Sequence, residues 1–187
     1  MNAYNFPFPD ITSSRSILEQ DYCFRKIDKC KIDDLIKDAW ETGQKEGERF
    51  LRDQKEGCAV FMPDVLKQEG FQVLYLNDDY IVGNRRYFCE YLSEKNIIKV
   101  YQQSVRLWCD ANGVGYEPGL NILLAHEYFH YLEWHRIGLT SKRYQVPMLR
   151  IGKWEIGKTG VAALSEIAAN SFSCRCFGCI NNEESED

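Results

Sequence analysis

One stretch of the sequence decides the fold: Leu120-Asn121-Ile122-Leu123-Leu124-Ala125-His126-Glu127-Tyr128-Phe129-His130-Tyr131-Leu132. It is apolar on nearly every side, and a helix of that kind is a buried helix. Pro118-Gly119 before it is a stop signal and Asn121 is a candidate cap, so we expect the helix to begin there and to run as far as Trp134. The sequence therefore predicts a helix at the centre of the molecule.

The central helix contains the pattern H-E-x-x-H, formed by His126, Glu127 and His130. Residues four apart lie one turn apart on the same helix face, so both imidazoles can reach one metal ion. Glu127 lies one position further round, where its carboxylate can reach a metal-bound water as a general base. The alternative is that both histidines are ordinary hydrogen-bonded core residues. Buried polar groups without partners are costly, and a divalent cation removes that cost, so the pattern favours a zinc site.

Zinc needs a third protein ligand, and we expect Glu166 to provide it. Its segment, Ala162 to Phe172, is rich in helix formers and small residues that allow close packing against the central helix. Glu133 is a fallback ligand, because it falls on the face of His126 but lies a further turn along the axis. Asn170, one turn after Glu166, is a candidate for orienting a ligand through a hydrogen bond, and Glu133 is a second candidate for that role.

Two neighbouring positions narrow the class of zinc site. Metzincins have a Gly and a His where this chain has Glu133 and Arg136, so that subgroup is excluded. His135 is turned about 140° around the helix from His130, so we expect it at the surface or behind the ligands.

The pattern His126-Glu127-x-x-His130 followed by Glu166-x-x-Ala169-Asn170-x-Phe172 resembles the ImmA/IrrE family of zinc metallopeptidases, over residues 57 to 180. In that gluzincin-like family a Glu from a later helix completes the site, and many members cleave or regulate a transcriptional repressor. The resemblance implies one Zn²⁺ per chain and a protein or peptide substrate, with a transcriptional regulator as a candidate. The chain departs from the family after the Glu motif, where Ser173 to Cys179 replaces a Leu-Leu-Met-Pro-like segment.

Three stretches rich in aromatic and β-branched residues precede the central helix and predict strands: Phe71 to Leu76, Arg86 to Leu92 and Asn96 to Tyr101. We expect an α+β, zincin-like fold, in which a small mixed or antiparallel sheet packs on the H-E-x-x-H helix and on a second helix that carries Glu166. In zincins the edge strand of such a sheet can hold an extended peptide by backbone hydrogen bonds. Ile97 to Tyr101 is the candidate edge, and a core strand is the alternative.

These positions lead to the hypothesis of zinc-dependent peptide hydrolysis. Zinc held by His126, His130 and Glu166 lowers the pKa of a bound water, and Glu127 takes its proton as the water attacks a peptide carbonyl. The oxyanion needs a further donor, and the candidates are Tyr131, His135, Tyr144 and Arg150. Alternatives are a non-catalytic zinc-binding regulatory protein on the same fold, a hydrolase of another amide and a self-processing enzyme.

Length and composition fit a globular protein, since the chain has 187 residues and is 44% hydrophobic. We expect residues 1–56 to form a helical segment packed on a metallopeptidase domain of residues 57–180, and residues 181–187 to form a disordered acidic tail. The N-terminus lacks the features of a signal peptide, and no apolar run is long enough to span a bilayer, so we expect a cytoplasmic protein without a membrane partner. A net charge of −5 without a basic block argues against direct nucleic-acid binding.

The eight cysteines are expected to be free thiols, because no signal peptide directs the chain to an oxidising compartment. Cys174, Cys176 and Cys179 have a spacing that suits a second metal, for which a fourth ligand would come from Cys23, Cys30 or Cys58. Buried helix cysteines are the preferred interpretation.

Overall fold

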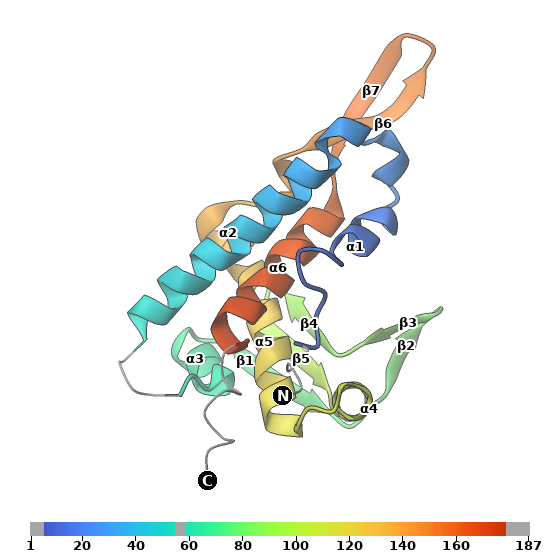
Figure 1. Cartoon of the computed structure of the whole chain (residues 1–187). Coiled ribbons are helices and arrows are strands. Elements are labelled where there is room, and N and C mark those ends of the chain that lie inside the picture. The colour runs from blue at the N-terminus through green and yellow to red at the C-terminus, as the bar shows by residue number, and fades with distance from the viewer. Residues whose placement is uncertain (1–5, 55–58, 179–187) are drawn as a thin grey trace.

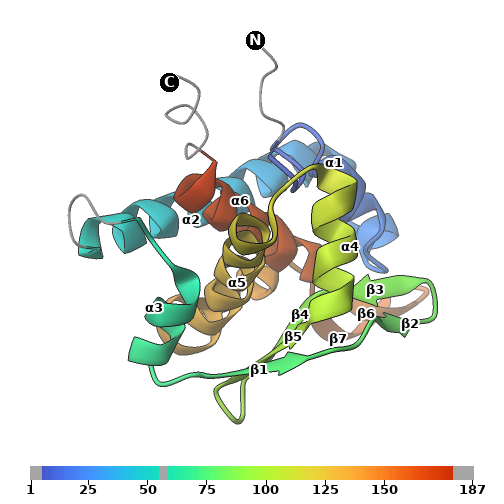
Figure 2. The ribbon, with the colours of Figure 1, turned by 90° about the horizontal axis from the view of Figure 1, so that it is seen from below.

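Three helices occupy the centre of the computed structural model, which describes residues 6–54 and 59–178. α5 (Tyr116–Leu132) packs against α6 (Ala162–Phe177), and α2 (Ile32–Asp53) runs along α6 (Figure 1). A small sheet covers α5 on another side, as the second view shows (Figure 2). The predicted α+β class is confirmed.

The shorter elements surround these helices. The short helices are α1 (Arg15–Glu19), η1 (Phe24–Lys26), η2 (Lys29–Lys31), α3 (Met62–Gln68), α4 (Gln102–Asn112), the π-helical turn η3 (Glu133–Ile137) and η4 (Thr140–Lys142). The strands are β1 (Gln72–Leu76), β2 (Tyr80–Val82), β3 (Arg85–Tyr87), β4 (Cys89–Leu92), β5 (Ile97–Tyr101), β6 (Gln145–Ile151) and β7 (Trp154–Gly160).

The start of α5 differs from the prediction. The helix begins at Tyr116 and not at Asn121, so Pro118 lies in its first turn, where a missing N–H has no intrahelical acceptor to lose. Asn121 lies inside the helix, and its Oδ1 accepts a hydrogen bond from the Met62 backbone N–H at 2.8 Å. The residue that was expected to cap α5 therefore ties α3 to it.

The main sheet has the strand order β1-β5-β4. β1 pairs with β5 in parallel, and β4 pairs with β5 antiparallel, so the sheet is mixed. The candidate edge strand Ile97 to Tyr101 is therefore the central strand, and the edge next to α5 is β4. The predicted strand Arg86 to Leu92 is divided at Phe88 into β3, which pairs with β2, and β4.

Close contact between α2 and α6 depends on two glycines of α2. A Cβ added to Gly43 would clash with the Ala168 carbonyl oxygen and lie 2.8 Å from the Phe172 N. At Gly47, one turn later, it would lie 2.8 Å from the Arg175 Cβ. The two backbones approach so closely that only hydrogen atoms fit between them at these points.

Two hydrophobic clusters fill the interior. The larger one surrounds α5 and the sheet, and the smaller one joins α1, the first turns of α2 and the start of α6. Cys176 is buried in the larger cluster, which supports the interpretation as a core cysteine, whereas Cys58 and Cys179 lie outside the described residues, as does the acidic tail 181–187. Within the described part of the chain, none of the helices combines the length and apolar character that crossing a bilayer requires.

Replacing Gly43 by Ala should destabilise the protein, although alanine favours an isolated helix by about 1 kcal/mol. The new methyl group would push α2 away from the backbone of α6, and overpacking of this kind costs about 1–3 kcal/mol. Lys45→Ala, on the exposed face of the same helix, is the control and should leave the free energy of unfolding nearly unchanged. Urea denaturation of both variants measures the difference, and equal midpoints would contradict the close contact.

Candidate metal centre

Two histidines of α5 and one glutamate of α6 bring their side chains together. The Nε2 atoms of His126 and His130 are 3.2 Å apart. The Glu166 carboxylate lies 3.3 Å from the His126 Nε2 and 3.6 Å from the His130 Nε2. Ligand atoms at the corners of a zinc tetrahedron with bonds of about 2.0 Å lie about 3.3 Å apart. These side chains are therefore spaced as ligands of one small cation.

The Nδ1 atom of each imidazole, which faces away from the centre, makes a hydrogen bond that holds the ring in place. Asn170 Oδ1 lies 3.0 Å from the His126 Nδ1, and Glu133 Oε2 lies 3.1 Å from the His130 Nδ1. Both partners are acceptors, so the Nδ1 atoms donate, and the Nε2 atoms are the ones that face the centre and could bind a cation. Asn170 thus lies behind a candidate ligand, at the position expected from the sequence.

Glu133 lies where it can orient His130, and not where the fallback ligand would lie. Only 2% of the residue is exposed, and its Oε1 accepts hydrogen bonds from the Thr140 N and the Ser165 Oγ, both at 2.8 Å. Burial raises the pKa of Glu133, but the bonds from His130 and Thr140 outweigh it, so that its pKa lies below the usual value. A fully bonded carboxylate on the Nδ1 side of His130 has no oxygen left for a metal on the Nε2 side.

The charges around the two imidazoles favour a cation. Burial lowers the pKa of His130, but the hydrogen bond that its ring donates to Glu133 and the charges of Glu166 and Glu127 raise that pKa to about 9. Burial raises the pKa of Glu166, yet His126 and His130 bring it down to about 2. More carboxylates than imidazoles surround the centre, so the centre attracts positive charge, which a divalent ion can supply in place of protons.

Glu127 lies beside the three candidate ligands and is held by the sheet. Its Oε2 accepts a hydrogen bond from the Tyr91 backbone N–H of β4 at 2.9 Å. It is not part of the group formed by His126, His130 and Glu166, whose ligand atoms all lie within 4.8 Å of one another. One carboxylate oxygen is thus fixed by the main chain, and the carboxylate borders the centre without being a ligand.

A cavity of about 520 Å³ opens over the centre. Part of its wall is formed by Phe8, Pro9 and Ile17, and another part by residues 86–91. The Phe8 ring lies 5.4 Å from the His126 ring. The N-terminal part of the wall was not predicted from the sequence. The apolar residues Phe6-Pro7-Phe8-Pro9 were the available signal, because such side chains favour packing against the rest of the protein over exposure to water.

None of the candidate oxyanion donors with a described side chain lines this cavity. Tyr131 packs among the aromatic rings of Phe71 and Tyr128, and His135 pairs with the Tyr91 hydroxyl at 3.1 Å. Tyr144 lies in the other core cluster, where its hydroxyl accepts from the Asp28 N. Arg150 is part of β6, and its side chain lies outside the described part of the structure. The lining residues with donor side chains are Arg86, Tyr87, Tyr91, His126, His130 and Asn170.

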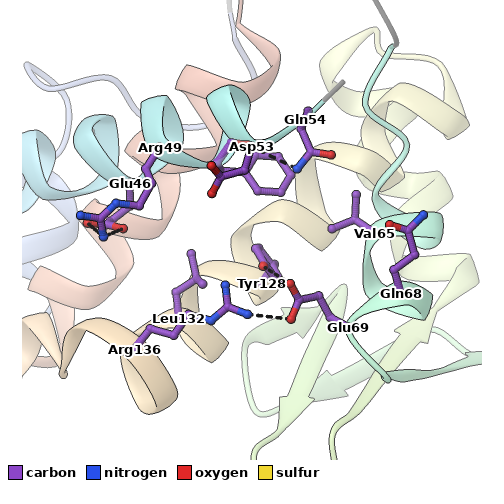
Figure 3. A pocket seen from close by; sticks show the side chains of 11 residues that line it. Glu46, Arg49, Asp53, Gln54, Val65, Gln68, Glu69, Tyr128, Leu132 and Arg136 are labelled. Atoms are coloured by element: carbon purple, nitrogen blue, oxygen red, sulfur yellow. Dashed lines mark hydrogen bonds and ion pairs between the residues drawn. The ribbon is translucent and has the colours of Figure 1, made fainter. Parts of the chain in front are cut away.

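A second cavity, of about 280 Å³, lies between α2, α3 and the end of α5 (Figure 3). Four of its charged residues form pairs, with Arg136 bonded to Glu69 at 2.7 Å and Arg49 to Glu46 at 3.1 Å. Among residues 6–54 and 59–178, no second group of His, Cys, Asp and Glu has the spacing of metal ligands. The candidate site is therefore the one on α5 and α6.

Comparison of the chain with protein-family models, with curated proteins and with solved structures gave no match.

Removing the Glu166 carboxylate should remove the bound metal. We expect the wild-type chain, purified without chelators and dialysed against zinc, to hold one zinc ion, and Glu166→Ala to hold less than one tenth of that under the same conditions. Glu94→Ala, an exposed glutamate of the β4–β5 turn, is the control and should keep the wild-type content. Mass spectrometry of metal content measures all three, and a full zinc content in Glu166→Ala would exclude Glu166 as a ligand.

Asn170→Ala should weaken zinc binding about 10–100-fold without removing it, because the His126 ring loses the acceptor that orients it. Asn170→Asp keeps an acceptor at that position and should restore most of the affinity. Competition with a chromophoric chelator gives the dissociation constants. Asn112→Ala, whose side chain bonds the Trp108 carbonyl at the end of α4, controls for a general effect of losing an asparagine.

Proposed function

We propose that the chain is a zinc-dependent metallopeptidase that hydrolyses peptide bonds of a cytoplasmic protein partner, with a zincin-like arrangement of its helices and sheet. The observation that supports this most is the spacing of the His126 Nε2, the His130 Nε2 and the Glu166 carboxylate, which matches the edges of a zinc tetrahedron. A glutamate that is not a ligand borders the same centre. Two imidazoles, a carboxylate and a neighbouring free carboxylate are the set that peptide hydrolysis by metal-activated water requires.

His126, His130 and Glu166 would hold the metal, which supplies a Lewis acid and a water of lowered pKa when bound. Glu127 accepts the proton of the attacking water and later delivers it to the leaving amine. Its Oε2 is engaged by the Tyr91 N–H, so the proton transfer falls to its Oε1. The same hydrogen bond fixes the direction of the carboxylate, because Tyr91 belongs to a strand that pairs with β5.

The substrate is proposed to lie along β4. Alternate residues of an antiparallel strand turn their backbone groups to opposite sides, and the Tyr91 N–H already faces away from β5 toward Glu127. The edge of β4 that faces away from β5 therefore borders the cavity, and an extended peptide can add there as a further strand through the backbone groups that Glu127 does not occupy. Phe8, Ile17 and Phe88 give this cavity apolar walls, which favours a substrate with apolar side chains next to the cleaved bond.

Glu127→Gln should abolish hydrolysis and leave zinc binding intact. The amide keeps the shape of the side chain but cannot accept a proton, so we expect the rate to fall at least about 100-fold. Cleavage of an unbiased peptide library, read by mass spectrometry, measures activity, and metal content is determined on the same samples. Glu117→Gln, in the exposed first turn of the same helix, is the matched control.

Retained cleavage in Glu127→Gln would exclude it as the base. A wild-type chain that binds zinc but cleaves neither the library nor a denatured protein substrate would instead support a regulatory zinc protein without turnover.

A further inference from the structure

The β6–β7 hairpin extends away from the helices at one end of the molecule (Figure 1). Its strands pair from Gln145 with Gly160 to Ile151 with Trp154 and form a sheet of their own. An isolated two-stranded ribbon is at best marginally stable in water. Residues 152–158 at its outer end are nevertheless all exposed. The ribbon thus has the properties of an element that is completed by a partner.

Apolar side chains occupy both faces of this ribbon. Trp154 is 78% exposed, and Leu149 and Ile156, which are paired across the strands, are each about half exposed. Met148 is 61% exposed and follows the opposite face, because successive residues of a strand alternate. Exposed apolar groups in a continuous patch indicate an interaction surface.

Basic residues lie both beside the base of the ribbon and along the ribbon itself. The Lys26 Nζ donates hydrogen bonds to the Pro147 and Met148 carbonyls at 3.1 and 2.7 Å, and the Tyr22 hydroxyl lies 3.1 Å from the Thr159 Oγ1. These bonds join residues 22–31 to residues 144–160, and we call the two segments together the basic end. The basic end contains Arg25, Lys26, Lys29, Lys31, Arg150, Lys153 and Lys158, with Asp28 and Glu155 as its acidic residues. Its net charge is therefore +5, in a chain whose net charge is −5.

We propose that the basic end is a docking surface for an anionic lipid bilayer. The apolar side chains of the ribbon enter the headgroup region, and the lysines and arginines contact lipid phosphates. Apolar burial and attraction to anionic lipids add up in such peripheral binding, and tryptophan is favoured at the interface between lipid and water. The proposal is independent of the metal centre.

The positions of the apolar groups favour a bilayer over two other anionic partners. A ribbon that reads nucleic acid presents polar and basic side chains to bases and phosphates, whereas the exposed pairs here include Leu149 with Ile156. A groove on an acidic protein covers one face of a ribbon and would leave either Met148 or Leu149 in water. The interface of a bilayer surrounds an inserted element on all sides, so both faces are covered.

Sedimentation with vesicles tests the proposal. The full chain is mixed with vesicles of phosphatidylcholine alone, or of phosphatidylcholine with about one third phosphatidylglycerol, at low and at high salt. We expect binding to the anionic vesicles, weak binding to the neutral ones and a loss of binding as salt rises. Lys153→Gln/Lys158→Gln should lower the partition coefficient about tenfold, and Leu149→Thr/Trp154→Thr/Ile156→Thr at least as much. Threonine keeps the strand propensity of the ribbon.

Matched controls carry the same kinds of change elsewhere. Lys67→Gln/Lys95→Gln removes two exposed lysines outside the basic end, and Leu107→Gln removes an apolar side chain of α4 that is 46% exposed. Both should bind like the wild type. In the folded wild type, a blue shift of tryptophan emission on adding anionic vesicles should disappear in Trp154→Phe while binding persists, which tests the insertion without disrupting the ribbon.

Equal binding of the ribbon variants and the wild type, or no preference for anionic vesicles, would overturn the proposal. Duplex DNA and polyglutamate are offered in parallel. Binding to either of these, with none to the vesicles, would assign the basic end to that partner and would equally overturn it.

Discussion

The burial of polar side chains on an otherwise apolar helix is the constraint on which the rest of the structure depends. α5 is apolar on nearly all sides, yet it carries two imidazoles at its most buried stretch. Their Nδ1 atoms are satisfied by Asn170 and Glu133, and each of those residues is itself buried. α6 must therefore pack closely on α5, because it supplies both Asn170 and the Glu166 carboxylate. The glycines of α2 then let a third helix cover the other side of α6.

Local spacing along the chain predicted which side chains come together at the candidate centre. A separation of four residues places His126 and His130 on one helix face, and small residues around Glu166 indicate a closely packed helix. Asn170 follows Glu166 by one turn, so a single helix brings both to α5. The role of Glu133 depended on geometry that spacing does not give. The π-helical turn that begins at Glu133 and the return of the chain through Thr140 turn its carboxylate to the Nδ1 side of His130.

Features that depend on long-range pairing could not be predicted. The order β1-β5-β4 requires the chain to place its last strand between the first two, and hydrophobic patterns carry no information on that choice. The edge that borders the cavity is consequently β4 and not Ile97 to Tyr101. The N-terminal wall of the cavity could not be predicted for the same reason, because Phe8 contacts His126 only through the tertiary fold. The β6–β7 ribbon lacks a clear signal in the sequence, since Pro147 lies within β6, Gly152 lies in the turn and Gly157 lies within β7.

The charge of a surface that the fold assembles can differ in sign from the net charge of the whole sequence. The chain is acidic overall and has no long basic block, which is why direct nucleic-acid binding was not expected, and no membrane partner was expected because no apolar run is long enough to span a bilayer. Folding brings residues 22–31 beside residues 144–160, and the resulting surface is basic although its two segments lie far apart in the sequence. β7 leads through Val161 directly into α6, the helix of Glu166. If a bilayer holds the ribbon, the orientation of the candidate metal centre relative to that surface is set by this short connection, because Val161 is fully buried and its N–H donates to the Ser141 carbonyl.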